Sequence, residues 1–221
     1  MTDSQSNILL SGQSLVSFSS GMSEQERVDI LDCLNYSEIR ADRKSDRRQA
    51  WRRWINYYQA GLFNNGFELS GALAYNVVAI TERRELLDVA RTAIQASGNK
   101  ELSDLAHAAL NTLLQSQQVQ TFFEDSFSVG QSESFQVVPC HKDVTGTIDV
   151  MVCGMQMQTA VTDGSWLQRP ESLMTVRMDG GAYRYSAQAY EPYRAKVTKG
   201  LERYSRIYFE SLSQTNQSRG G

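Results

Sequence analysis

Cys140 and His141 are adjacent in the sequence, so a thiol nucleophile stands next to a base. An imidazole can activate a thiol only when the two side chains come within hydrogen-bond reach of each other. Alternating apolar residues predict a strand over residues 135–141, and successive strand residues point to opposite faces of a sheet. The backbone therefore separates the two side chains, and we expect no catalytic dyad at this position.

Other patterns typical of catalytic or metal sites do not occur. The chain has two histidines and no CxxC or HxxxH spacing, so zinc ligation is not expected. Its glycines form neither GxGxxG nor GxxxxGK, which excludes the common phosphate-binding loops. We therefore predict no catalytic, cofactor-binding or metal-binding residues and lean towards a non-enzymatic function, with an enzyme whose pocket is invisible in the sequence kept as an alternative.

Three cysteines, Cys33, Cys140 and Cys153, are too few and too irregularly spaced for a disulfide framework. Counting outward from a predicted hairpin turn at residues 143–146 places Cys140 opposite Asp149 and Cys153 opposite Gln136. The last two cysteines are then not cross-strand neighbours. We expect all three to be reduced and buried.

Basic residues are concentrated within residues 40–53, which contain seven positively charged and two negatively charged side chains. This segment carries a net charge of +5 in a chain whose net charge is −3, so the rest carries −8. Such a patch could bind an acidic surface on a second copy or partner, or an anionic membrane, and the acidic remainder makes nucleic acid unlikely to be the target. The candidate interaction residues are Arg43, Arg47, Arg48, Arg52 and Arg53.

The same segment runs into a helix that would position these arginines. Apolar residues at helical spacing predict one buried stripe made of Trp51, Trp54, Ile55, Tyr58 and Leu62. Asp46 with Gln49 resembles a capping box at the helix start, and Gly61 and Gly66 are candidate stops. Two tryptophans and a tyrosine bury a large area, so we expect other elements to pack on this helix.

Residues 7–18 hold apolar side chains in a segment too short to form its own core. We expect either a disordered tail or a strand that adds to a sheet edge, in its own chain or in a neighbouring copy. The side chains that would make this contact include Ile8, Leu10, Leu15 and Phe18.

The remaining elements follow from caps, periodicity and alternation. Ser23 and Glu26 cap a first helix, and two more helices form a hairpin over residues 81–113. Residues 64–80 favour a turn and one or two short strands, although residues 73–80 could instead be a buried helical turn. The four strands of the sheet are predicted at 135–141, 147–159, 173–178 and 182–190, and Glu191-Pro192 opens a last helix. The second strand is apolar on both faces, so both faces must be covered by helices of the chain or by another molecule.

The fold class is therefore α+β, with about four amino-terminal helices packed on a four-stranded antiparallel sheet and a closing helix. We divide the chain into an arm (1–22), a helical region (23–122), a connector (123–134), a sheet with its helix (135–212) and a polar tail (213–221). Together these segments are expected to form one compact domain. The segment ADRKSDRRQAWRRWINYYQAGLFNNGFEL and the closing YxxYRAKVTKGL resemble uncharacterised soluble bacterial proteins of the pseudomonad type, a resemblance that implies this architecture and no activity or site residues.

Composition is that of a globular protein, with 41% hydrophobic and 21% charged residues among 221. The longest apolar run, residues 73–80, is too short to cross a membrane, and the amino terminus lacks a secretory signal. We expect cytoplasmic synthesis and leave export by a signal-independent route open. The leading functional prediction is a self-associating or partner-binding protein, a homo-oligomer or assembly subunit. The alternative is a membrane-active or toxin-like effector that uses the basic segment or an element that refolds.

Overall fold

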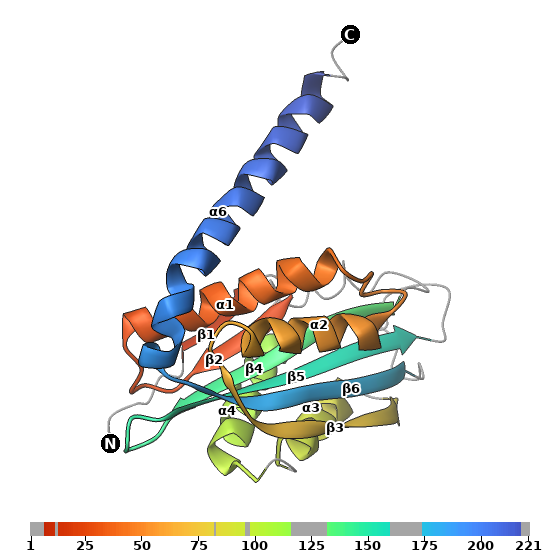
Figure 1. Cartoon of the computed structure of the whole chain (residues 1–221). Helices are drawn as coiled ribbons and strands as arrows, with labels where there is room; N and C mark the ends of the chain where they lie inside the picture. Colours follow the sequence, from red (N-terminus) through yellow and green to blue (C-terminus); the bar gives the residue numbers. More distant parts are fainter. Residues whose placement is uncertain are drawn as a thin grey trace.

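A computed structural model describes residues 7–11, 13–81, 83–95, 98–115, 132–159 and 174–217. It has three layers, with a six-stranded sheet between two layers of helices (Figure 1). The α+β class predicted from the sequence is confirmed. The strands are β1 (Asn7–Ser11), β2 (Ser14–Phe18), β3 (Glu68–Ile80), β4 (Ser132–Lys142), β5 (Ile148–Thr159) and β6 (Met174–Tyr185). The helices are α1 (Glu24–Asp42), α2 (Trp51–Phe63), α3 (Arg83–Gln95), α4 (Lys100–Gln115) and α6 (Ala187–Gln217).

The sheet differs in detail from the predicted four antiparallel strands. Its order is β1-β2-β4-β5-β6-β3, and β2 pairs with β4 in parallel, so the sheet is mixed. Two of the additional strands come from residues 7–18, which lie in the sheet of their own chain rather than in a neighbour's sheet. The third additional strand is β3, which forms one edge of the sheet and pairs with β6 along nearly all of its length.

The third and fourth predicted strands are a single strand, β6, which passes straight through the predicted turn at residues 179–181. The glycines there serve close approach rather than a turn. A Cβ atom on Gly180 would lie 1.9 Å from the carbonyl oxygen of Val152 on β5, a distance that no side chain tolerates. Gly180 therefore lets the backbones of β5 and β6 pack closely, whereas a Cβ atom on Gly181 would crowd the side chains of Gln59 and Tyr183.

The last helix begins earlier than predicted. Ser186 precedes it, and its carbonyl accepts the Tyr190 N–H at 2.9 Å, so Pro192 lies inside the helix rather than at its start. Pro192 is the sixth residue of α6, so it lies beyond the first turn and removes the backbone hydrogen bond that the Gln188 carbonyl would otherwise accept. In Figure 1, α6 projects away from the rest of the protein along most of its length.

Each face of the sheet has its own apolar core. The α1–α2 layer, residues 24–63, covers one face together with the start of α6, and the α3–α4 layer, residues 83–115, covers the other (Figure 1). In β5 the even-numbered Val150 and Val152 face the first layer, whereas Met151 and Met155 face the second. The prediction that both faces of this strand are covered is confirmed, and helices of the same chain supply the cover.

The predicted stripe on α2 is confirmed, because Trp51, Trp54, Ile55, Tyr58 and Leu62 are all buried. The predicted helix start is wrong. The carboxylate of Asp46 accepts the N–H groups of Arg48 and Gln49 in a separate turn, and α2 itself begins after Ala50, which has no capping side chain.

Both glycines near the end of α2 have identifiable roles. The helix continues through Gly61, where a Cβ atom would lie 2.6 Å from the Ser37 hydroxyl oxygen, so this glycine permits the close crossing of α1 and α2. Gly66 follows the helix with a φ of +90°, the left-handed conformation that favours glycine. Of the two predicted stops, Gly66 is therefore the one that the chain uses.

Candidate functional site

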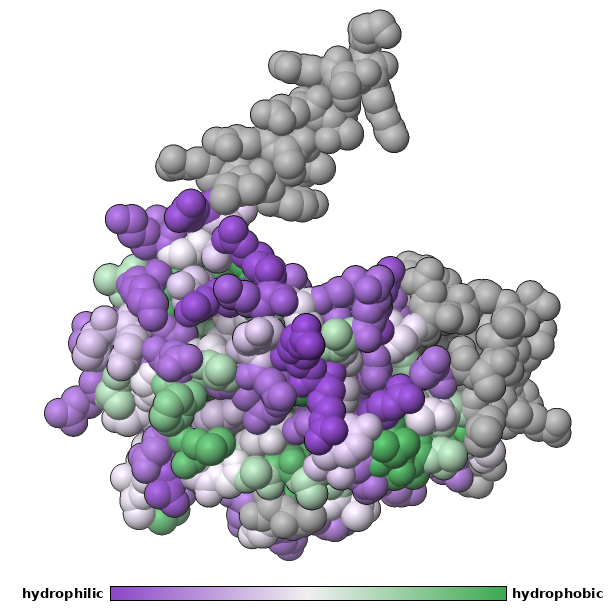
Figure 2. All heavy atoms as spheres, turned by 45° about the vertical axis from the view of Figure 1, so that its right-hand side comes forward, coloured by the Kyte–Doolittle hydropathy of each residue, from purple (hydrophilic) through white to green (hydrophobic). Residues whose placement is uncertain are grey.

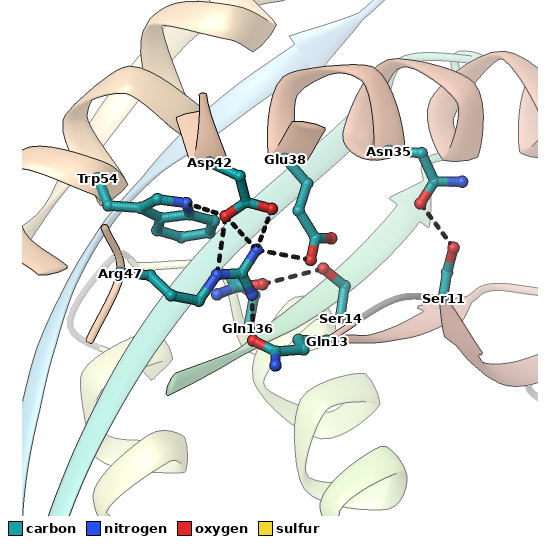
Figure 3. Close-up of polar contacts among 9 residues, drawn as sticks. All are labelled: Ser11, Gln13, Ser14, Asn35, Glu38, Asp42, Arg47, Trp54 and Gln136. Atoms are coloured by element: carbon teal, nitrogen blue, oxygen red, sulfur yellow. Dashed lines mark hydrogen bonds and ion pairs between the residues drawn. The ribbon is translucent and has the colours of Figure 1, made fainter. Parts of the chain in front are cut away.

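The basic segment divides into inward-facing and outward-facing arginines. Arg47 points inward, and its side chain is 12% exposed. Its guanidinium donates to Glu38 at 2.9 Å and to Asp42 at 2.7 Å, contacts the side-chain oxygen of Gln13, and lies 4.4 Å from the ring centroid of Trp54 (Figure 3). Arg47 is therefore committed to contacts within the chain.

A polar network extends from Arg47 to the amino-terminal strands (Figure 3). The indole N–H of Trp54 donates to Asp42 at 2.7 Å, and the hydroxyl of Ser14 donates to Gln136 at 3.2 Å. Burial raises the pKa of Glu38, and the neighbouring Arg47 offsets only part of this effect. The network joins the β1–β2 turn, α1 and the segment before α2, so it is a structural connection and not a surface for a partner.

Arg43 is also engaged within the chain. Its guanidinium lies 5.3 Å from the ring centroid of Tyr204 on α6 and donates to the tyrosine hydroxyl at 3.1 Å. Contacts of this kind, on exposed side chains, fix orientation more than they add stability. Arg43 therefore belongs to the contact between α1 and α6.

Arg48, Arg52 and Arg53 point outward at the start of α2. Arg48 forms an ion pair of 2.5 Å with the buried carboxylate of Glu133, and Arg52 lies 4.5 Å from the ring centroid of Tyr75. These arginines line a depression of about 540 Å³ together with Arg177 of β6. The sequence could not reveal Arg177 as a partner, because β6 reaches this place only through its pairing with β3 and β5.

The predicted contact residues of the amino-terminal segment pack inside the chain. Ile8 and Leu15 contact the core beneath the α3–α4 layer, and Phe18 lies in the core beneath the α1–α2 layer. Leu10, on the edge strand β1, is 39% exposed. Of the four side chains, Leu10 is the one in a position to meet another molecule.

Ion pairs hold the α1–α2 layer to its surroundings. Lys142 of β4 pairs with Glu26 of α1 at 2.7 Å, and Arg194 of α6 pairs with the buried Asp29 at 2.7 Å. The hydroxyl of Tyr185 on β6 donates to the same Asp29 at 2.6 Å. Burial opposes ionisation of Asp29, but the hydrogen bonds from Arg194 and Tyr185 outweigh it and lower its pKa. Breaking these contacts would leave buried charges without partners, which is costly.

The α3–α4 layer is held differently. Its buried face is made of leucine, isoleucine and small residues: Leu86, Ala90, Ile94, Leu102, Ala106, Ala109 and Leu110. Its polar links to the sheet include the Asn99 amide donating to Asp149 at 3.2 Å and the Ser17 hydroxyl donating to the Leu105 carbonyl at 3.4 Å. The carboxylate of Glu85 on α3 also accepts the N–H of Thr81, directly after β3, at 2.5 Å. Apolar contact therefore dominates its attachment.

The sheet face beneath this layer is rich in methionine. Five of the chain's seven methionines are buried there: Met151, Met155, Met157, Met174 and Met178. Methionine is flexible and polarizable, so a methionine surface can adapt to more than one apolar partner. This face is therefore an adaptable apolar surface.

The three cysteines are free and buried, as predicted. Cys140 pairs with Val150 and Cys153 with Val137, one residue from the predicted partners, and the two thiols face opposite cores. Burial raises the pKa of Cys33 and of Cys153 to about 12, so these thiols do not ionise at neutral pH while the core is closed. Cys140 lies in the core beneath the α1–α2 layer. Its neighbour His141 follows it along β4, so the two side chains point to opposite faces of the sheet.

Within the described ranges, no cluster of histidine, cysteine, aspartate or glutamate side chains could hold a metal ion. Among the described helices, none combines the length and apolar character needed to cross a membrane.

No protein-family model matches the chain, and no curated protein matches it. Among solved structures, it is similar to a delta-endotoxin with a TM-score of 0.48 and 10% identity, covering 80% of this chain and 82% of that one. It is similar to the activated Cyt2Ba monomer from Bacillus thuringiensis subsp. israelensis with a TM-score of 0.45 and 9% identity, covering 79% and 96%. It is also similar to the Evf virulence factor with a TM-score of 0.37 and 14% identity, covering 90% and 82%.

Proposed function

We propose that this chain is a membrane-active, toxin-like effector whose α3–α4 layer separates from the sheet at an anionic membrane. The observation that carries the proposal is the unequal attachment of the two helical layers. The α1–α2 layer is tied to the sheet by the partly buried Lys142–Glu26 ion pair and by the buried Asp29, which accepts the Tyr185 hydroxyl, whereas the α3–α4 layer rests mainly on apolar contact. A membrane can replace apolar contact but offers no partner for these charged groups.

The energetics favour this exchange. Fully burying a leucine, isoleucine or methionine side chain is worth roughly 1.5–3 kcal/mol, and a bilayer interior offers the same gain as a protein core. In water the separated layer would expose two apolar surfaces at once, so it stays closed. At a bilayer both surfaces can be covered by lipid, and the remaining cost includes the hydrogen bond from the Asn99 amide to the Asp149 carboxylate and the neutral one from the Ser17 hydroxyl to the Leu105 carbonyl.

The connections of the layer suit a hinged opening. At one end β3 leads directly into α3, so the layer stays attached to the sheet edge. At the other end Asn99, between α3 and α4, is held by Asp149 at the start of β5. Release of this contact frees the turn of the helical hairpin, and the hairpin can then swing about the β3 junction.

A reversible crosslink tests the proposal. In a variant with Asn99→Cys and Asp149→Cys, a short reducible bifunctional thiol reagent should tie the hairpin turn to the sheet, because the native side chains are 3.2 Å apart. We expect the crosslinked protein to lose dye release from vesicles containing phosphatidylglycerol and to regain it after reduction. Each single cysteine variant treated with the same reagent serves as the control for side-chain loss.

The buried native cysteines should not react with the reagent in the closed protein. Equal dye release before and after reduction, with the crosslink verified by mass spectrometry, would contradict opening of the α3–α4 layer. Recovery on reduction separates the effect of the tether from any instability caused by losing Asn99, whose side chain also accepts the Leu102 N–H at the start of α4.

A further inference from the structure

We infer that the depression at the start of α2 is a binding site for a phosphate-bearing group. Four arginines line it, three from residues 48–53 and one, Arg177, from β6. Planar guanidinium groups recognise phosphate oxygens through paired hydrogen bonds, and arginine is the preferred residue for this purpose. The depression has a volume of about 540 Å³. This volume is larger than that of a phosphate ion and could hold a phosphorylated head group or another small phosphorylated molecule.

Most of this positive charge is not neutralised by the protein. Arg48 pairs with Glu133, but no carboxylate in the described part of the chain forms an ion pair with Arg52, Arg53 or Arg177. Asp179 interacts electrostatically with Arg52 without forming such a pair. A local excess of positive charge therefore persists in a chain whose net charge is −3. Figure 2 shows strongly hydrophilic side chains gathered across the middle of one face of the molecule, above apolar patches.

The start of α2 adds to the positive electrostatic potential at the depression. Ala50 precedes α2 and provides no side-chain acceptor, so no side chain caps the first N–H groups of the helix. Uncapped N–H groups and the positive end of the helix dipole favour an anion at this position. The preceding carboxylate, Asp46, is already bound to the N–H groups of Arg48 and Gln49 and does not reach α2.

A buried donor without a partner marks the same place. Trp51 is 2% exposed and lines the depression, and its indole N–H has no hydrogen-bond acceptor among the described residues. A buried donor that lacks an acceptor is costly, so its presence calls for an explanation. A phosphate group bound in the depression that Trp51 lines would bring oxygen acceptors close to this residue.

Hydrogen bonds from strands β4 and β5 orient Arg177 at the edge of the depression. Its Nη1 donates to the side-chain oxygens of Gln156 at 3.3 Å and Gln158 at 3.2 Å, and Gln156 in turn donates to the Ser132 hydroxyl at 2.5 Å. Both contacts of Arg177 use Nη1. The guanidinium is thus oriented before a ligand arrives, which reduces the entropy lost on binding.

Titration with glycerol phosphate, followed by tryptophan fluorescence and calorimetry, tests the site without any membrane. The variant with Arg53→Gln and Arg177→Gln removes two charges that have no ion-pair partner in the described residues. We expect its affinity to fall by about tenfold or more, as the loss of charge-assisted hydrogen bonds implies. Arg203→Gln, at an exposed arginine on α6, is the matched control and should bind like the unaltered protein.

A second titration identifies the source of the phosphate group. Vesicles of phosphatidylcholine with phosphatidylglycerol are compared with vesicles of phosphatidylcholine alone. Vesicle binding that glycerol phosphate competes with assigns the site to a lipid head group, and glycerol phosphate binding without competition assigns it to a soluble phosphorylated ligand. No binding of glycerol phosphate, or equal affinity in the double variant, would overturn the inference.

This site goes beyond membrane activity, and the two proposals can fail separately. The glycerol phosphate titration does not require the α3–α4 layer to open. The crosslink between positions 99 and 149 does not involve the depression, which lies at the opposite helical layer.

Discussion

Deletion of residues 1–21 is expected to abolish cooperative folding of the monomer. The deletion removes β2, which lies inside the sheet between β1 and β4. It removes three side chains that are at most 3% exposed: Leu15, Val16 and Phe18. Each is worth roughly 1.5–3 kcal/mol of burial, and a domain of this kind is stable by only about 5–15 kcal/mol. Circular dichroism during urea unfolding should show no sigmoidal transition.

Two single substitutions test the contribution of individual side chains of β1 and β2 to stability. Phe18→Ala should lower the free energy of unfolding by about 3–5 kcal/mol, as other buried phenylalanine truncations do. Leu10→Ala, on the exposed edge strand β1, should change it by less than about 1 kcal/mol. A truncated chain with the unfolding midpoint and slope of the full chain would show that residues 7–18 are not part of the sheet.

Arg47→Ala is expected to lower the free energy of unfolding by about 3–5 kcal/mol, because it leaves Glu38 buried without its counter-charge. Arg53→Ala is the matched control. It removes an exposed arginine six residues further on and should cost less than about 0.5 kcal/mol. Urea unfolding of both variants and the unaltered protein gives the comparison.

Acidity should lessen the effect of Arg47→Ala. Burial already raises the pKa of Glu38 in the folded protein, and loss of Arg47 removes the offsetting charge. A carboxyl whose folded pKa lies above its unfolded value destabilises the fold at neutral pH, and the penalty shrinks as the pH falls through the folded pKa. If Arg47→Ala were as mild as Arg53→Ala at neutral pH, the inward position of Arg47 would be wrong.

Periodicity predicted the buried stripe of α2, and capping predicted the start of α1 but not the starts of α2 and α6. The stripe on α2 and the capping box of Ser23 and Glu26 on α1 depend on residues within a few positions of one another, and the structure confirms both. The two-sided apolar pattern of β5 likewise predicted that both faces of the sheet would be covered. These features depend on residues that are close together in the sequence, so they can be predicted from one sequence alone.

Features that depend on distant pairing could not be predicted. The parallel pairing of β2 with β4 joins residues more than 100 positions apart, and nothing in either strand specifies it. Gly180 and Gly181 have the composition of a turn, but they lie inside β6, where Gly180 permits close contact with β5. The sequence showed the positive charge of residues 40–53. The inward orientation of Arg47 and the position of Arg177 beside the start of α2 depend on tertiary packing.

The leading prediction from the sequence, self-association, stays a prediction. Its main positive argument was that residues 7–18 needed a sheet edge to cover them. The sheet of the same chain provides that cover. The geometry therefore gives more support to the membrane-active alternative, which uses the unequal attachment of the two helical layers.

The native cysteines allow the most direct test of that account. Cys153 lies beneath the α3–α4 layer, whereas Cys33 of α1 and Cys140 of β4 lie in the core between the α1–α2 layer and the sheet, and all three are fully buried. A membrane-permeant maleimide present while vesicles containing phosphatidylglycerol are added would trap whichever thiol becomes accessible. Peptide mass spectrometry then reports the extent of labelling at each cysteine.

The account predicts labelling of Cys153 while the layer opens on addition of these vesicles, before lipid covers the sheet face, with Cys33 and Cys140 still protected. Vesicles of phosphatidylcholine alone should leave all three thiols unlabelled, as in solution. Protection of Cys153 at a membrane to which the protein is bound, or equal labelling of all three cysteines, would contradict selective opening of the α3–α4 layer.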